Sequence, residues 1–147
     1  MDLVIHRPEG LYCPPGDFYI DPWRPVERAV ITHAHSDHAR AGNRHYLAAA
    51  PGAGVLRARL GAVDLQLLPY GEQIGHHGVR LSLHPAGHVL GSAQVRLEYG
   101  GDEEQRVTQH RIWLRGGVAR RLLPRLPLRS PRAGALRDPA YLSAWTW

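Results

Sequence analysis

Three histidines and one aspartate occur within six positions, directly after an apolar stretch with the composition of a buried strand. The segment reads Val30-Ile31-Thr32-His33-Ala34-His35-Ser36-Asp37-His38. Imidazole and carboxylate groups are the ligands that suit Zn²⁺ and neighbouring transition metals. At this density, the pattern favours a metal site over a set of surface histidines in a polar loop.

The spacing within this segment indicates two metal ions. If the chain leaves the strand in an extended conformation, His33 and His35 lie on the same side of the backbone and can share one ion. Asp37 and His38 are adjacent, so their side chains point elsewhere. Ligands divided in this way are typical of paired metals roughly 3.5–4 Å apart, which activate water and stabilise a phosphoryl or acyl transition state.

A second loop carries a further candidate ligand. His84-Pro85-Ala86-Gly87-His88-Val89-Leu90-Gly91-Ser92 lies between two segments of strictly alternating polarity. Gly87 and Gly91 let the backbone turn without steric cost, so His88 is able to project into a cleft. We therefore expect His88 to complete the first metal's set as a third imidazole. We expect His84 to be structural and the other histidines to be ordinary surface or turn residues, namely His6, His45, His76, His77 and His110.

The periodicity predicts a mixed α/β fold within one ordinary domain. Alternating or apolar runs predict strands at residues 3–5, 17–21, 29–32, 46–49, 63–68, 79–83 and 93–99. A helix is predicted over Pro51 to Leu60, because proline suits its first turn and glycine follows its end. A short helix is predicted over Asp37 to Ala41 after Ser36 as cap, and the proline-rich segment 11–16 is predicted to be a loop.

The charge is distributed unevenly along the chain. Residues 1–110 hold ten arginines against twelve acidic residues, whereas residues 111–147 hold eight arginines against Asp138 alone. No apolar run is long enough for a membrane span, and Met1-Asp2-Leu3-Val4 lacks the features of a signal peptide, so we expect a cytoplasmic protein without a membrane partner. Cys13 is the single cysteine, which excludes an internal disulfide, and we expect it to be a packed small residue.

These motifs resemble the metallo-β-lactamase superfamily, through the segment from Thr32 to His38 and through Pro85-Ala86-Gly87-His88. The segments from Gly10 to Trp23 and from Ala86 to Gln94 narrow the resemblance to bacterial ligase-associated DNA exonucleases. These are relatives of the β-CASP nucleases, and some are described as mRNA 3′-end processing factors. The resemblance covers about residues 3 to 107.

The resemblance implies a metal-dependent phosphodiester hydrolase of DNA repair. His33, His35 and His88 would hold one Zn²⁺, and Asp37 and His38 would hold another, with Mn²⁺ as the alternative ion. Asp37 is then also the candidate catalytic residue. Asp21 would orient the histidine loop from outside, unless it merely forms the turn before Pro22. The implied partners are DNA, with RNA as the alternative, and an ATP-dependent DNA ligase; the implied fold is the N-terminal half of an αββα sandwich.

The chain departs from the family pattern after Tyr99. It has no Ser-Gly-Asp-Tyr segment, whose aspartate bridges the metals in the family, and it lacks the later metal histidine and the β-CASP insertion. Asp102 lies in a Gly-Gly-Asp-Glu-Glu turn and is expected to be a solvated acid. We therefore expect residues 1–110 to be the N-terminal part of a truncated domain with reduced or no activity. Alternatives are a thioester or lactone hydrolase of the same fold, or an inactive fragment.

Residues 111–147 form a tail rich in arginine, proline and leucine, without the period of a strand or a helix. We expect the tail to be irregular, either disordered or the product of a reading-frame shift near residues 107–111, because GC-rich DNA read out of frame yields this composition. The alternative is a natural basic tail that binds nucleic acid through phosphate contacts. The other frames of the encoding DNA distinguish these hypotheses.

Overall fold

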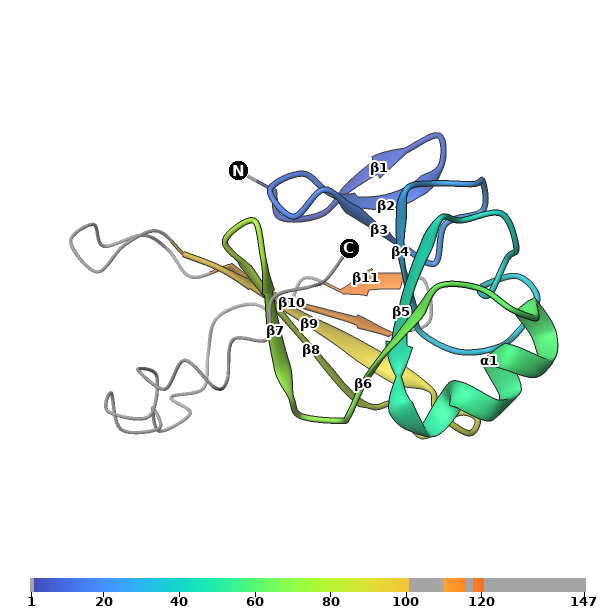
Figure 1. Ribbon diagram of the computed structural model, residues 1–147. Helices are drawn as coiled ribbons and strands as arrows, with labels where there is room; N and C mark the ends of the chain where they lie inside the picture. Colours follow the sequence, from blue (N-terminus) through green and yellow to red (C-terminus); the bar gives the residue numbers. More distant parts are fainter. Residues whose placement is uncertain (1, 101–109, 116–117, 121–147) are drawn as a thin grey trace.

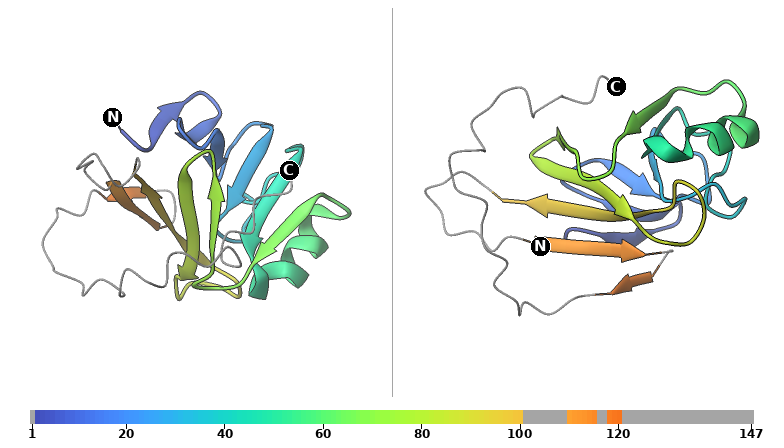
Figure 2. Two further views of the ribbon diagram at one scale, coloured as in Figure 1. Left: turned by 60° about the vertical axis from the view of Figure 1, so that its left-hand side comes forward. Right: turned by 90° about the horizontal axis from the view of Figure 1, so that it is seen from below.

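The computed structural model describes residues 2–100, 110–115 and 118–120, which form two β-sheets and one α-helix. The sheets pack face to face, and the helix lies beside the outer face of the first sheet (Figures 1 and 2). Within this described part, no helix has the length and apolar composition that crossing a bilayer requires.

The first sheet changes from antiparallel to parallel pairing along its strand order. Its strands, in spatial order, are β1 (Ile5–Arg7), β2 (Gly10–Cys13), β3 (Phe18–Ile20), β4 (Arg28–Ile31), β5 (His45–Ala49) and β6 (Leu65–Leu68). The pairs β1–β2 and β2–β3 are antiparallel, and β3 through β6 are parallel. Parallel strands bring their carboxyl ends to the same edge, so the residues that follow β3 and β4 meet there.

The second sheet is antiparallel throughout. Its strands, in spatial order, are β11 (Val118–Arg120), β10 (His110–Arg115), β9 (Ala93–Tyr99), β8 (Val79–Pro85) and β7 (Gln73–His76). Strands β10 and β11 include the first residues of the tail, where the sequence pattern indicated no strand. Residues 121–147 and Asp102 lie outside the described residues, so the frame-shift hypothesis stays a prediction.

Alternation along the central strands builds two cores, one on each face of the first sheet. Val30 and Leu47 point toward the second sheet, where they pack with residues such as Leu81, Leu83 and Val95. Cys13 belongs to this core, and burial raises the pKa of its thiol to about 11. The expectation of a packed small residue is thus confirmed.

The second core lies between the first sheet and the helix. Here Ile31, Tyr46 and Ala48 pack against Leu56 of α1 (Ala53–Leu60), which continues from the 3₁₀ turn η1 (Ala50–Gly52). The helix ends at Gly61, whose positive φ of 73° suits glycine. The layers are therefore helix, sheet and sheet, and the predicted layered α/β class, a partial sandwich, is confirmed.

Two local predictions were wrong. Residues 11–13 pair with β3 as strand β2 before the prolines begin, so the predicted loop is restricted to the turn that follows. Residues 37–41 belong to two separate turns instead of a helix: the Ala39 N–H donates to the His35 carbonyl, and the His38 side chain is held by Asp21. Strand β7 was not predicted, because Gln73–His76 has no apolar alternation.

Candidate metal centre

Two loops meet at the edge where β4 ends and β9 begins. We call residues 32–38 the histidine loop and residues 86–92 the His88 loop. The Ala93 N–H donates to the Thr32 carbonyl at 2.8 Å, which joins the histidine loop to the start of β9, directly after the His88 loop. Between them lies a cavity of about 450 Å³, lined by Thr32, His33, His35, Asp37, His38, Ala86, Gly87, His88, Ser92 and Ala93.

Three imidazole nitrogens converge in this cavity. His33 Nε2 lies 3.1 Å from His35 Nδ1, and His88 Nε2 lies 3.4 Å from the same His35 atom. Two nitrogens bound to one tetrahedral Zn²⁺ at 2.0–2.1 Å stand about 3.4 Å apart. The spacing and the chemistry of His33, His35 and His88 therefore fit one transition-metal ion.

Hydrogen bonds indicate which nitrogen of His33 carries a proton. Thr32 Oγ1 donates to the Asp21 carboxylate, so the same oxygen can accept a hydrogen bond from His33 Nδ1, 3.0 Å away. His33 Nε2 is then left with its lone pair toward His35 and His88. Burial is the largest cause that lowers the pKa of His33, and the neighbouring His38 lowers it further. Both effects favour the neutral imidazole that a metal ion requires.

Asp21 ties the histidine loop to the end of β3. Its buried carboxylate accepts hydrogen bonds from the Thr32 backbone N–H and from His38 Nδ1, each at 2.7 Å. Its φ of 44° is uncommon outside glycine, although aspartate adopts it more readily than most residues. The position is the one that an orienting residue needs, and that role stays a prediction.

Asp37 and His38 lie beside the first group, and the fold holds His38 more firmly than Asp37. His38 donates from Nδ1 to Asp21, so its Nε2 is directed toward Asp37, whose Oδ2 lies 3.5 Å away. The hydrogen bond to Asp21 is the largest cause that raises the pKa of His38. The Asp37 side chain is 70% exposed, and a hydrogen bond with its own backbone is the main cause that lowers its pKa. The pair could hold a second ion next to the first.

Hydrogen bonds and a close contact between two glycines hold the His88 loop in place. Ser92 Oγ accepts the backbone N–H groups of His88 and Val89, at 3.1 and 3.2 Å, and the Tyr70 hydroxyl donates to the Ser92 carbonyl. Gly91 lies on Gly52 of η1, and a Cβ at Gly91 would stand 2.1 Å from the Gly52 Cα atom. Only glycine allows this approach.

Sequence reasoning missed several supporting residues. The role of Thr32 could have been suggested by its place between the strand and His33, and that of Ser92 by its place four residues after His88. Gly52 gave no local signal, because its partner is far away in the sequence. His84 lies apart from the three converging imidazoles, with its Nε2 3.0 Å from Ser82 Oγ.

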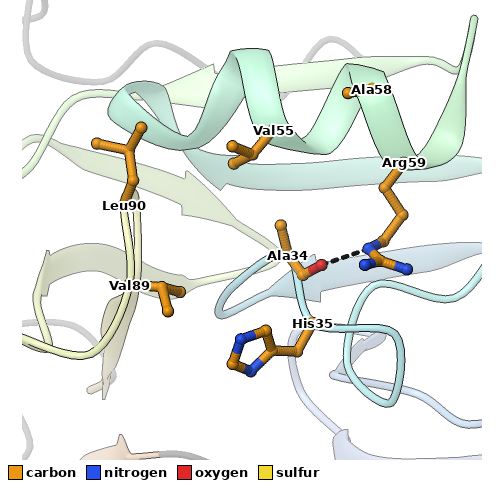
Figure 3. Close-up of a pocket in the computed structure, with 7 residues that line it drawn as sticks. All are labelled: Ala34, His35, Val55, Ala58, Arg59, Val89 and Leu90. Atoms are coloured by element: carbon orange, nitrogen blue, oxygen red, sulfur yellow. Dashed lines mark hydrogen bonds between the residues drawn. The ribbon is translucent and has the colours of Figure 1, made fainter.

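An apolar groove of about 680 Å³ adjoins His35 (Figure 3). Val55 and Ala58 of α1 line one side, and Val89 and Leu90 of the His88 loop line the other. Arg59 closes one end and donates from Nε to the Ala34 carbonyl. Leu90 is 67% exposed, so the groove is open to solvent beside the candidate metal ligands.

Comparison with known proteins gives one relative in sequence, and no family model matches the chain. The chain is 44% identical over 95 residues to a protein of Opitutus terrae named probable DNA ligase. This match covers 62% of the chain but 9% of the relative, so the chain spans about a tenth of that protein's length.

The solved structures that are similar to the chain include several metallo-β-lactamases. One is the native FEZ-1 enzyme from Legionella gormanii, with 18% identity and a TM-score of 0.47 over 76% of the chain and 55% of that enzyme. Another is described as the first B3 enzyme with an active-site glutamic acid, with 16% identity and a TM-score of 0.46 over 75% of the chain and 53% of that enzyme. The chain thus covers about half of the length of each of these two enzymes.

Proposed function

We propose that the chain is part of a metal-dependent phosphodiester hydrolase that acts on DNA, with RNA as a further substrate to test. The observation that carries this proposal is the convergence of His33, His35 and His88 at nitrogen separations of 3.1 and 3.4 Å. The relative named probable DNA ligase supports DNA as the substrate and a DNA ligase as the partner.

The proposed ions are Zn²⁺, with Mn²⁺ as the alternative. A bound divalent ion would lower the pKa of water and polarise a phosphoryl oxygen. Within the chain, His33, His35 and His88 provide one set of ligands, and Asp37 and His38 provide the other. Asp37 is the candidate catalytic residue, because it is the acidic residue in the cavity lining and its carboxylate is exposed.

Other residues of the chain hold these ligands in place. Asp21 holds His38 directly and holds His33 through the Thr32 hydroxyl, so one carboxylate orients a ligand in each group. The Ala93–Thr32 hydrogen bond sets the distance between the two loops. His35 and His88 are exposed, which suits a polymeric substrate whose phosphate must reach the ligands from outside.

We further propose that the two ions are held unequally. The carboxylate that lies within 4.8 Å of a histidine nitrogen of each group is that of Asp21, and its oxygens already accept hydrogen bonds from Thr32 and His38. The second ion then depends on Asp37 and His38, and we expect it to bind weakly and the hydrolysis to be slow.

Metal analysis and hydrolysis assays test this function together. Purified protein is loaded with Zn²⁺, dialysed, and measured for zinc per chain and for hydrolysis of single- and double-stranded DNA. His88→Ala should lose the tightly bound zinc. His84→Ala is the matched control, because it removes a histidine four residues away that does not converge with the others. A wild-type protein that retains no transition metal after loading contradicts the proposal.

The apolar groove beside His35 favours one second candidate. Val55, Val89 and Leu90 would suit the acyl part of a thioester or a lactone, which metal-dependent hydrolases of this type can cleave. Hydrolysis of a thioester at a higher kcat/KM than DNA would favour this candidate.

A further inference from the structure

A further hollow lies beside the histidine loop, with Ser36 in its lining. It measures about 430 Å³, and its lining includes Trp23, Arg24, Ser36, Arg40 and Arg59. We call it the Trp23 hollow. Neither the candidate ligands nor their supporting residues use it, so its combination of an indole with three arginines needs a separate explanation.

The indole of Trp23 is held firmly although it is not buried. Its Nε1–H donates to the Pro8 carbonyl at 2.7 Å, and its backbone N–H donates to the Glu9 carbonyl at 2.9 Å. The side chain is nevertheless 44% exposed, more than that of any tyrosine or phenylalanine in residues 2–100. A ring fixed at its edge and open on its surface is a ready platform for another flat group, because little conformational freedom is lost on stacking.

The arginines of the hollow differ from four other arginines of residues 2–100. Arg24, Arg40 and Arg59 are exposed and form no ion pair with any carboxylate of the described residues. By contrast, each of the following arginines pairs with an acidic side chain: Arg28, Arg44, Arg80 and Arg96. The hollow therefore concentrates uncompensated positive charge, which suits an anionic ligand.

Two of these guanidinium groups are also anchored. Arg59 donates from Nε to the Ala34 carbonyl, and Arg40 donates from Nε to the Asp37 carbonyl at 3.4 Å. Both anchors use Nε, so the terminal nitrogens stay available to bind phosphate oxygens. Anchoring lowers the entropy that these long side chains lose when they bind a ligand.

The hollow is separated from the proposed site of hydrolysis by the histidine loop alone. Ser36 lines the hollow, while the next two residues, Asp37 and His38, line the metal cavity. Arg59 lines both the hollow and the groove beside His35. A strand that lies in the hollow can therefore reach the metal ligands by crossing one loop.

We propose that the Trp23 hollow binds single-stranded DNA next to the bond that is cleaved, with a base stacked on the indole and phosphates on the three arginines. A fixed aromatic ring beside unpaired cations is the arrangement that binds single strands, because every unpaired base offers a flat face and every nucleotide a charge. Duplex DNA keeps its bases stacked internally and cannot use the indole. The choice of DNA rests on the proposed function.

Binding of a fluorescein-labelled 12-nucleotide oligo(dT), followed by anisotropy on the full chain without added metal, tests the proposal. Trp23→Ala should weaken binding by between about fivefold and about a hundredfold, the range for one base stacked on an aromatic ring. Trp23→Phe should recover much of the affinity, because it keeps a flat ring. Thermal melts followed by circular dichroism check that both variants fold.

Salt dependence tests the arginines separately. Changing Arg24, Arg40 or Arg59 to alanine should reduce the slope of log K against log salt by about 0.7 each. Arg57→Ala and Arg44→Ala are matched controls, since each removes one positive charge from an exposed arginine that does not line the hollow. All variants keep the basic residues 111–147, so any contribution of that segment is the same in each.

Two results would overturn the proposal. One is unchanged affinity in Trp23→Ala; the other is an equal loss in Arg57→Ala and Arg59→Ala, which would mean that binding depends on overall charge alone. Zinc content and hydrolysis of bis(p-nitrophenyl) phosphate, measured on the unaltered protein, test the proposed function independently. Binding that depends on Trp23 in a protein without zinc or hydrolysis would support the hollow and contradict the proposed function. Zinc binding and hydrolysis by the unaltered protein, together with unchanged oligo(dT) affinity in Trp23→Ala, would support the proposed function and contradict the role of the hollow.

Discussion

The two ligand groups of the candidate metal centre differ in how firmly the fold holds them. His33, His35 and His88 come from loops on both sheets, which the Ala93–Thr32 hydrogen bond joins. Asp37 and His38 come from one turn, and Asp37 is 70% exposed. A site fixed by two sheets has its geometry before the metal arrives, whereas a site on one turn has to be ordered by the ion. We therefore expect the first group to bind a metal ion more strongly than the second.

The largest expected effect distinguishes the two groups directly. His33→Ala should weaken zinc binding by more than about a hundredfold. Loss of a metal ligand costs more affinity than loss of a residue that hydrogen-bonds to a ligand, which costs up to about a hundredfold. Asp37→Ala should leave the tightest zinc in place. Competition with a chromophoric chelator measures both affinities, and equal losses in the two variants would show that the groups are not separable.

The next effect concerns the support of the His88 loop. Gly91→Ala places a Cβ within 2.1 Å of the Gly52 Cα atom and imposes a φ of 76° on an alanine. We expect the free energy of unfolding to fall by about 1–3 kcal/mol or more, and zinc affinity to fall with it. Urea unfolding gives the stability. Gly87→Ala is the control, since it also has a positive φ but meets no atom within 4 Å.

A smaller effect separates the two roles of Asp21. Thr32→Val removes the hydroxyl between Asp21 and His33 but leaves the Asp21–His38 hydrogen bond. We expect zinc affinity at the first group to fall by about tenfold, the lower end for outer partners of metal ligands. Thr32→Ser keeps the hydroxyl and should restore the affinity. If serine and valine behave alike, the hydroxyl does not orient His33.

The smallest effect is the opposite titration of the two groups in the metal-free protein. Burial lowers the pKa of His33 below 6.5, so the unfolded chain binds more protons there and stability is lost as pH falls below that value. Asp21 raises the pKa of His38, so its contribution is present below pH 6.5 and is lost as pH rises through the raised value. NMR titration of the imidazole signals should give His33 the lower pKa, and the reverse order would contradict the hydrogen-bond assignment.

Much of the candidate site followed from local sequence, because its ligands lie at short spacings or beside glycine. His33 and His35 are two residues apart, and His88 lies between Gly87 and Gly91. The Asp21–Thr32 contact depends on the parallel pairing of β3 with β4, which periodicity cannot assign. The strand order could not be predicted either, since the composition of a short apolar segment does not indicate which strand it pairs with.

The Trp23 hollow could not be predicted from the sequence, for a related reason. Trp23 follows β3, Arg40 follows the histidine loop and Arg59 lies on α1, so no spacing relates them. Their positive charge is also hidden in the totals, because residues 1–110 are slightly acidic as a whole. Only the fold brings the three side chains to one place.

The hydrogen bond between Ala93 and Thr32 makes one backbone amide a reporter for the whole centre. An ion shared by His33 and His88 would act as a clasp across the two sheets, and the energy of holding it would resist their separation. Hydrogen exchange at the Ala93 amide would then slow when zinc is added, and a higher zinc affinity would slow it more. Opening of the sandwich could thus be followed at a single atom, without any substrate.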